Sequence, residues 1–293
     1  MRVAVTGGTG FVGTHVTRAL LNAGHDVVVV ARGTRRPVKH ERVTFVQADV
    51  TADDGLTEAF ARCFTVINLP AVIHERGKQT FDRVNREGTE RVVAAARQAG
   101  VRHLIHQSAN GADPDPRFPY LCTKWQGEQA AVGGGVPYTV LRPSLIFGPG
   151  DGFFTLIAKL VRLTPATPIA GDGSTLFQPI AVEDVTQCIL LALQRGPSNS
   201  VQTIGGPEHL TYNDIARIVK RAIGVHRYAV HVPVRMVVPG AFMMQKVMRK
   251  PLVTVEQLKM LSKNNITRLD SVPARFGFEP LRFVDGADYL QDY

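Results

Sequence analysis

The sequence predicts an α/β fold in which a doubly wound parallel sheet is followed by a smaller α/β domain. Short apolar stretches such as RVAVTG, DVVVVAR and HLIHQSA alternate with helical patterns through the first two thirds of the chain. Strands that are buried on both faces read as continuous apolar runs, and such strands alternating with helices are typical of a parallel sheet covered on both sides. A glycine-rich turn, TGGTGFVG, joins the first strand to the first helix.

Each expected element has its own local pattern. The strands are rich in β-branched residues and lie at 2–7, 26–32, 44–50, 65–71, 103–109 and 138–148. Helical patterns lie between them at 14–24, 55–63 and 87–100, and again later at 209–224. Gly24 and Gly100 end two of these helices, because glycine readily adopts the left-handed conformation that commonly closes a helix.

The alternation loosens after about residue 150. Stretches rich in glycine and proline, GPGDG and TPATPIAGDGS, precede a helical segment in which Ile215, Ile218, Val219 and Ala222 share one face. We therefore expect a large domain over 1–150, with a return segment near 176–205. A smaller domain is expected over most of 151–293.

The composition of the chain limits the classes of protein to which it can belong. The chain has 293 residues, of which 44% are hydrophobic, enough to bury a large core. No window approaches the roughly 18–20 consecutive apolar residues that span a bilayer, and the chain begins with a strand-like segment, MRVAVTG. We expect an intracellular, cytoplasmic protein, with peripheral attachment to the inner face of a membrane left open. Cys63, Cys122 and Cys188 lack the spacing of zinc or redox sites, so no metal site is expected.

Positive charge is concentrated in one part of the chain. Residues 217–282 hold 13 Lys and Arg against Glu256, Asp270 and Glu279, so the net charge of +9 arises there. This indicates an anionic partner, which is a phosphate-bearing substrate, an acidic lipid or an acidic protein. A solvated basic surface is the alternative. The charge comes without interleaved aromatic residues or a reader motif, so we expect no nucleic-acid partner.

The glycine-rich turn predicts a dinucleotide site. Glycines at 7, 8, 10 and 13 follow a strand and open a helix, so the backbone can turn tightly, approach a pyrophosphate and present the helix N-terminus to its charge. The alternative is a structural turn without a ligand. The residues expected to lie along the cofactor here are Gly7, Thr9, Gly10, Phe11 and Val12.

The residues after the second strand favour NADP(H) over NAD(H). In such folds a carboxylate at this point commonly binds the adenosine ribose, but here the strand ends VVVVAR and continues GTRR. No acid repels a 2′-phosphate, and Arg32 with Arg35 or Arg36 could bind one. If these arginines form only a solvated loop, the preference stays open. Asp49 and Val50, which end FVQADV, are expected near the adenine, with an exposed turn as the alternative for the aspartate.

The segment PYLCTKWQGE places Tyr120 four residues before Lys124. On a helix this spacing puts both side chains on one face. Tyrosine normally loses its proton near pH 10, and a nearby ammonium favours the phenolate, so the pair could move a proton at neutral pH. A chance pair on a helix surface is the alternative. The pair lies about a dozen residues after Ser108, which ends a strand, and it follows a dinucleotide loop. This position favours the functional interpretation.

With the glycine loop, the Tyr-x-x-x-Lys pair and LRPSLIFGPGD, the chain resembles the extended short-chain dehydrogenase/reductases, which are epimerase- and dehydratase-like proteins with a Rossmann fold. QPIAVEDV and VNREGTERVVAAA extend the resemblance over nearly the whole length. More narrowly, NLPAVIHERGKQTFDRVNREGT and PLVTVEQLKMLSKNN resemble the atypical branch related to the nucleotide-binding accessory subunit of respiratory complex I.

The resemblance implies roles for individual residues. Tyr120 would donate or accept the proton, Lys124 would bind the nicotinamide ribose and lower the tyrosine pKa, and Ser108 would hold the substrate oxygen. Ser108 is followed by Ala109 and Asn110 in a loop with DPDPRFP, which departs from the family pattern. Four further residues would lie along the cofactor, the last on the nicotinamide side: Leu69, Pro70, Ala71 and Pro143.

The sequence leaves two possible functions open. In the first, the protein is an oxidoreductase or epimerase that exchanges hydride between nicotinamide and an unidentified small molecule. In the second, it is an accessory or sensor that holds the nucleotide without turnover and docks on a membrane respiratory complex through 217–282. The segment PVRMVVPGAFMMQKVMRKP combines methionines with cations, as a helix on a membrane surface or in a partner's groove would. Packing on the core is the alternative for these methionines. Pro239 and Pro251 bracket the expected helix, which is about three turns long.

Overall fold

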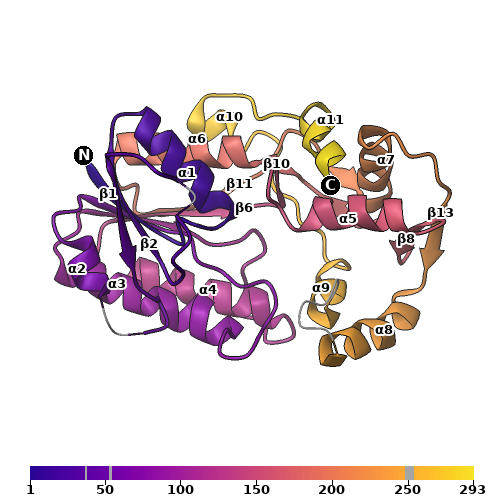
Figure 1. The fold of residues 1–293 in the computed structure, drawn as a ribbon, viewed down its shortest axis with the longest axis horizontal. Helices are drawn as coiled ribbons and strands as arrows, with labels where there is room; N and C mark the ends of the chain where they lie inside the picture. Colours follow the sequence, from indigo (N-terminus) through magenta and orange to yellow (C-terminus); the bar gives the residue numbers. More distant parts are fainter. Residues whose placement is uncertain (37, 53–54, 248–253) are drawn as a thin grey trace. The chain divides into compact units, whose positions relative to one another are not determined.

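The computed structural model describes residues 1–36, 38–52, 55–247 and 254–293. Two compact units make up the chain (Figure 1). Unit 1 comprises Met1–Pro143 and Val182–Ile204, and unit 2 comprises Ser144–Ala181 and Gly205–Tyr293. The assignment of unit 2 to a substrate or a partner stays a prediction.

Unit 1 is built on a seven-stranded sheet in the order β11-β6-β5-β4-β1-β2-β3, and every pair of neighbours is parallel. Its strands are β1 Arg2–Thr6, β2 Asp26–Ala31, β3 Val43–Gln47, β4 Thr65–Asn68, β5 His103–Gln107, β6 Tyr138–Pro143 and β11 Ser200–Ile204. Its helices are α1 Phe11–Asn22, α2 Leu56–Phe60, the π-helical η1 Asp82–Glu87, α3 Gly88–Gln98, α4 Pro119–Gly133 and α6 Val182–Arg195. This arrangement confirms the predicted doubly wound parallel sheet.

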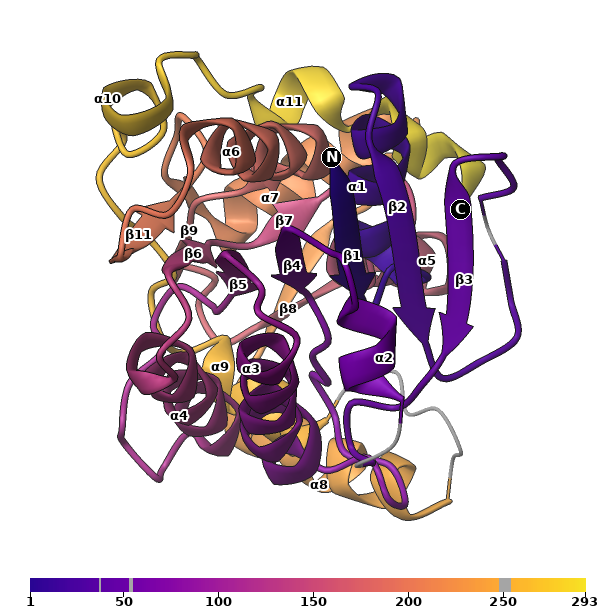
Figure 2. The same cartoon turned by 90° about the vertical axis from the view of Figure 1, so that its left-hand side faces the viewer.

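Helices cover both faces of the unit 1 sheet, as Figure 2 shows. Helices α1 and α6 lie on one face, and α2, α3 and α4 lie on the other. All residues of β4 and all but the first of β2 are buried, which explains why these strands read as continuous apolar runs. The edge strand β3 is only partly buried.

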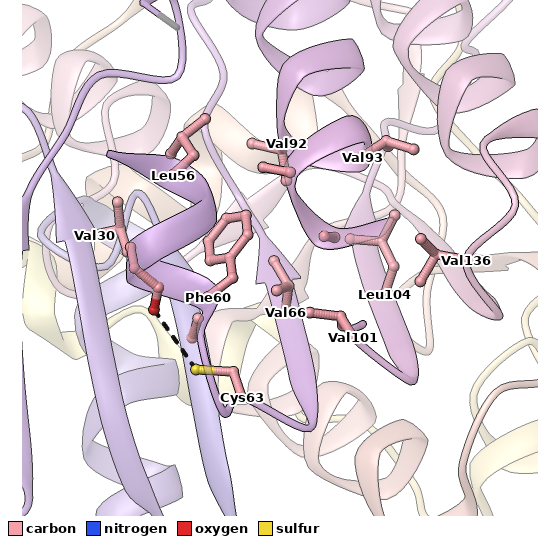
Figure 3. Packing of buried hydrophobic residues seen from close by; sticks show 14 of the residues in the cluster. Val30, Leu56, Phe60, Cys63, Val66, Val92, Val93, Val101, Leu104 and Val136 are labelled. Carbon is pink, nitrogen blue, oxygen red and sulfur yellow. Dashed lines mark hydrogen bonds between the residues drawn. The ribbon is translucent and has the colours of Figure 1, made fainter. Parts of the chain in front are cut away.

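The core between the sheet and α2–α4 is formed by small branched side chains packed around one aromatic ring (Figure 3). Phe60 is fully buried against Val66 of β4 and Leu104 of β5. Cys63 lies in the same cluster and donates to the Ala59 carbonyl at 3.7 Å. Its thiol is therefore a packing group in the core of unit 1.

Unit 2 contains short strands and helices around an aromatic cluster. Its strands are β7 Ile146–Phe147, β8 Thr167–Ala170, β9 Leu176–Phe177, β10 Ile180–Ala181, β12 Leu210–Thr211 and β13 Ala229–Val232. Its helices are α5 Phe153–Leu163, α7 Tyr212–Ala222, α8 Val234–Val247, α9 Val255–Met260, α10 Pro273–Phe276, α11 Phe283–Gly286 and the 3₁₀ helix η2 Asp288–Asp292. The rings of Phe147, Phe154 and Phe283 contact one another in its core.

Two local expectations differ from the structure. The strand expected at 138–148 is divided, because β6 ends at Pro143 and Ile146–Phe147 pairs with β10 instead. Helix α8 contains Pro239, although the sequence suggests that a helix begins there. Of the basic methionine-rich segment, residues 248–253 lie outside the described residues, as do the side chains of Met244 and Lys246. Within the described ranges, no helix is both long and apolar enough to cross a membrane.

Candidate active site

The glycine loop between β1 and α1 forms a tight turn against the sheet. Gly7 has φ +69°, its N–H donates to the Val30 carbonyl at 2.9 Å, and its own carbonyl accepts from Gly10 at 2.9 Å. A Cβ at Gly13 would lie 2.2 Å from the Gly7 oxygen and 2.7 Å from the Gly8 Cα. Only glycine therefore permits this approach of α1 to the turn, which keeps backbone rather than side chains at the surface of the loop.

The first turn of α1 suits an anion. Gly10 caps the helix without a side-chain hydrogen bond, and the first turn contains no acidic residue. Thr9 and Phe11 are partly buried at this end, and Val12 is buried beneath it. The N–H groups of the first turn have no intrahelical acceptors, so they and the helix dipole are available to a pyrophosphate.

The segment after β4 lies against the glycine loop. A Cβ at Gly7 would meet the Pro70 nitrogen at 3.2 Å, which places Pro70 beside the turn. Leu69 is buried, Ala71 is exposed, and Asn85 holds the next residue by accepting from the Val72 N–H at 3.1 Å. The fold thus brings together two of the sequence-predicted cofactor segments, 7–12 and 69–71.

The arginines after β2 lie on the opposite side of the loop. Arg32 is exposed directly after the strand, and its carbonyl accepts from the Gln47 side chain at 3.1 Å. The Arg36 guanidinium lies over the Phe45 ring, 5.1 Å from its centre. A small hollow is lined by both the glycine loop and this arginine: Gly8, Val29, Arg36, Val38, Val43 and Phe45. Arg36 is therefore positioned beside the loop, with its guanidinium supported by an aromatic face.

Asp49 is engaged in its own turn. One of its carboxylate oxygens accepts from the Thr51 N–H and from the Thr51 hydroxyl, each at 2.9 Å. Val50 is buried in the core and packs against Gly88, where an added Cβ would meet its Cγ2 at 3.0 Å. The Asp49 carboxylate thus has a structural task, which is the alternative that the sequence left open. Contact of either residue with adenine stays a prediction.

Ser108 follows β5 and is almost fully buried, with 3% of its surface exposed. Its N–H donates to the Leu141 carbonyl at 2.8 Å, and the Asn110 N–H donates to the Pro143 carbonyl at 2.9 Å. These bonds fix the loop after β5 to the end of β6, so that Ser108 and Pro143 lie at neighbouring strand ends. Within the described part of the chain, the Ser108 hydroxyl has no hydrogen-bond partner. Five threonine hydroxyls of the described residues also have no partner, so it is the position of Ser108 at the sheet edge that makes its hydroxyl a candidate to bind a ligand atom.

Tyr120 and Lys124 both lie on α4, one turn apart. The Lys124 ammonium is buried and donates to the Gln107 carbonyl at 2.7 Å, which ties α4 to the end of β5 next to Ser108. Tyr120 is partly buried, and its ring meets the edge of Phe81 with 5.9 Å between ring centres. The two residues thus share one helix and are buried or partly buried, while their role at a cofactor stays a prediction.

The pKa values of the pair shift in opposite directions. Burial raises the pKa of Tyr120 to about 12, whereas the resemblance implies a lowered value. Burial lowers the pKa of Lys124 to about 8, and the nearby Glu128 carboxylate opposes this shift. The difference has a physical cause, because the Lys124 ammonium is directed to a carbonyl while the phenol loses its hydration. Tyr120 therefore holds its proton at neutral pH.

Glu128 continues the same helix face and is buried, with 1% exposed. It accepts two hydrogen bonds from Arg142 of β6, at 2.6 and 2.7 Å. The forked geometry of arginine suits such a two-point contact with a carboxylate. Sequence reasoning does not assign this partner to Arg142, although the spacing of Tyr120, Lys124 and Glu128 at intervals of four is a visible signal for Glu128.

A buried polar network under the strand ends is also missed by the sequence. Thr6 donates to the Asn68 side-chain oxygen at 2.7 Å, and the Asn68 amide lies 3.1 Å from Nδ1 of His106. Burial, with the Lys124 ammonium close by, lowers the pKa of His106 well below 6.5, so the ring is neutral. The network links β1, β4 and β5 directly behind the loops that carry the predicted residues.

The predicted residues therefore gather at one edge of the unit 1 sheet. The carboxyl ends of parallel strands share an edge, and ligands of open α/β sheets bind there. Gly7 follows β1, Arg32 follows β2, Leu69 follows β4 and Ser108 follows β5, while Pro143 ends β6. Among the described residues, no group of three or more His, Cys, Asp or Glu is placed to hold a metal ion.

Comparison with known proteins agrees with this geometry. The model of the NAD dependent epimerase/dehydratase family matches residues 3–205. The chain is 26% identical to a mitochondrial NADH dehydrogenase (ubiquinone) 1 alpha subcomplex subunit 9 of Arabidopsis thaliana, covering 96% of this chain and 76% of that protein. It is 27% identical to a 3-beta-hydroxysteroid dehydrogenase of Mycolicibacterium neoaurum, covering 96% of this chain and 87% of that enzyme.

Solved structures show the same fold. A dTDP-glucose 4,6-dehydratase of Streptomyces venezuelae with NAD bound superposes with a TM-score of 0.79, at 22% identity over 99% of this chain and 96% of that one. The fold, the glycine loop after β1 and the match over 3–205 confirm the resemblance, including its relation to complex I subunits. The chain belongs to the NAD dependent epimerase/dehydratase family.

Proposed function

We propose that the chain is a nicotinamide-dependent oxidoreductase or epimerase in which Tyr120 serves as the acid or base. The observation that carries the proposal is the buried Ser108 hydroxyl without a partner, next to the strand end that Lys124 holds. A substrate oxygen bound at this sheet edge would satisfy the Ser108 hydroxyl, whereas storage of nucleotide alone does not require it.

The side chains divide the chemical work. Bound nicotinamide would supply or accept hydride. The Ser108 hydroxyl would hold the substrate oxygen, and Tyr120, which keeps its proton because burial raises its pKa to about 12, would donate that proton as a carbonyl is reduced. Lys124 would hold the ribose of the cofactor, and its present bond to Gln107 keeps it at the correct strand end. The protonated tyrosine is the form that acts as the acid when a carbonyl is reduced.

The test is NADPH oxidation with a panel of ketones and aldehydes. Tyr120→Phe should lower the turnover about a hundredfold or more, since general acid catalysis typically contributes that much, and should leave the Kd of NADPH unchanged. Tyr138→Phe removes the same hydroxyl from β6 and is the matched control. Turnover that survives Tyr120→Phe would refute the assigned role.

The cofactor is proposed to be NADP(H) in preference to NAD(H). Arg32 and Arg36 support this, because both are exposed after β2 and Arg36 lines the hollow beside Gly8. Arg32→Ala with Arg36→Ala should weaken NADPH binding by tenfold or more, at about 1.5–3 kcal/mol per charged hydrogen bond, and should spare NADH. Lys39→Ala removes an exposed cation from the same loop as a control. Equal losses for both nucleotides would contradict the preference.

The second candidate is an accessory or sensor role on a membrane respiratory complex. It is favoured by the similarity to the alpha subcomplex subunit 9, which extends over 96% of this chain. In that case purified protein should retain bound nucleotide that stays unchanged during incubation with the same carbonyl panel. Steady turnover would exclude a purely accessory role. A cytoplasmic location, at the inner face of a membrane, stays a prediction under either function.

A further inference from the structure

Unit 2 exposes apolar side chains in one short segment. Eleven large apolar side chains are exposed among the described residues, and five of them lie between 228 and 243. Tyr228 is 90% exposed, Met236 67%, Met243 58%, Phe242 50% and Val230 48%. Single exposed apolar residues need no explanation, but five of them within sixteen residues of sequence point to contact with another apolar phase.

The same segment lacks negative charge. No Asp or Glu occurs between Asp214 and Glu256, although eight Lys and Arg lie there. Among the described side chains, Arg221 and Arg235 are exposed, as are the imidazoles of His226 and His231. The nearest acid is already used, because Asp214 pairs with Arg217 at 2.9 Å and caps α7. The described part of this segment, residues 215–247, therefore presents cations and apolar groups without any acidic residue of its own.

Helix α8 places two of the exposed methionines on one face. Met236 and Met243 are seven residues apart, which puts them on one face of the helix, and Arg235 precedes the first of them. The helix spans Val234–Val247 and carries Pro239. Its length of 14 residues, about 21 Å at 1.5 Å per residue, suits a position along a membrane surface and is too short for a span.

We propose that residues 215–247 dock unit 2 on the surface of a lipid bilayer that contains anionic lipids. Charge complementarity favours anionic lipid as the partner, because its negative surface attracts a segment that holds only positive charge. The adaptable methionines and the amphipathic Tyr228 suit the boundary between headgroups and acyl chains. An acidic protein would satisfy the cations but would leave the five scattered apolar side chains without a defined pocket.

The docking surface is independent of turnover. Its described apolar residues, Tyr228, Val230, Met236, Phe242 and Met243, lie outside the residues assigned to cofactor and catalysis, all of which belong to unit 1. Membrane binding can therefore be tested on any preparation of the full chain, with or without activity. A failure of the proposed oxidoreductase function would leave this inference untouched, and the reverse also holds.

The experiment is co-sedimentation of the full chain with phosphatidylcholine vesicles that contain or lack phosphatidylserine. We expect binding only with phosphatidylserine and release by salt, because surface attraction is screened over a Debye length. Met236→Gln with Met243→Gln should weaken partitioning by tenfold or more through the loss of apolar burial. Arg235→Glu should weaken it by about fivefold or more, as expected for about 1 kcal/mol per cation at the surface.

Matched controls keep the test specific. Leu163→Gln removes a side chain that is 80% exposed on α5, outside the segment, and should leave vesicle binding unchanged. Circular dichroism checks that each variant is folded. Absence of binding to phosphatidylserine vesicles at low salt would overturn the proposal, as would binding that the paired methionine variant leaves intact. Segment-dependent binding to polyglutamate without any binding to vesicles would overturn it in favour of an acidic protein.

Discussion

Lys124 is a basic side chain that the fold removes from water, with 2% of its surface exposed and one hydrogen bond, to the Gln107 carbonyl. Burial lowers its pKa from 10.5 to about 8. Between these two values the unfolded chain still binds the proton that the folded chain has released. Raising the pH through this window therefore increases the stability of the fold relative to the unfolded chain. Burial of Lys124 therefore lowers the stability of the folded protein at neutral pH by a measurable amount.

The prediction is a pH-dependent difference between the wild type and Lys124→Met. Because the methionine cannot titrate, the free energy of unfolding should change by about 3 kcal/mol in favour of the wild type from neutral pH to above the ordinary lysine pKa. Chemical denaturation at a series of pH values measures it. Lys39→Met, at an exposed site, should show no such trend. A flat difference for Lys124→Met would mean that the buried lysine keeps its ordinary pKa.

The ion pair between Glu128 and Arg142 joins α4 to β6 beside the candidate site. Glu128 is 2% exposed as a side chain and Arg142 is 24% exposed, so the pair is mostly removed from water. The desolvation of such a pair is compensated only while both members are present. The positions of Tyr120 and Lys124 therefore depend on this contact, which lies two turns after Tyr120 and one turn after Lys124 on α4.

Arg142→Met should destabilise the protein by about 3–5 kcal/mol, because it leaves the Glu128 carboxylate buried without its partner. Adding Glu128→Gln should restore part of that loss, since it removes the uncompensated charge. The exposed pair Arg268 and Asp270 is the matched control, and its double removal should change the free energy of unfolding far less, because solvent screens the pair. Thermal and denaturant unfolding of the single and double variants completes the cycle. Equal costs at both pairs would refute the burial argument.

Local signals explain why some elements could be predicted and others not. The helix spacing of Tyr120 and Lys124 is visible in four residues, and α4 confirms that both lie on one helix. The turn that occupies the Asp49 carboxylate was also visible, because an aspartate two residues before Thr51 commonly bonds to that backbone. The start of α8 was missed because Pro233 favours a helix start five residues before the one expected.

At the scale of the whole molecule, prediction depends on how many chain segments must meet. The parallel sheet follows from repeated apolar strands and helices, so the fold was predictable from pattern alone. The bond from Lys124 to Gln107 and the network of Thr6, Asn68 and His106 depend on strand order and register, which no local pattern encodes. Sequence could therefore supply the candidate site residues but not the groups that hold them in place.

Unit 1 contains every residue assigned to the cofactor, although these residues are spread from Gly7 to Pro143. We predict that NADPH slows amide hydrogen exchange in three separate stretches, 7–13, 69–72 and 107–110, because backbone of each lies at the same sheet edge. Exchange measured by mass spectrometry on the full chain, with and without NADPH, would locate the protection.

Gly13→Ala should abolish that protection, because a Cβ there would lie 2.2 Å from the Gly7 oxygen and the loop would have to move. Gly33→Ala is the matched control, since a Cβ at that position meets nothing within 4 Å. Protection confined to unit 2, or full protection in Gly13→Ala, would contradict the assignment of the cofactor site. Protection of all three stretches that disappears only with Gly13→Ala would establish that one bound molecule connects strand ends more than a hundred residues apart in the sequence.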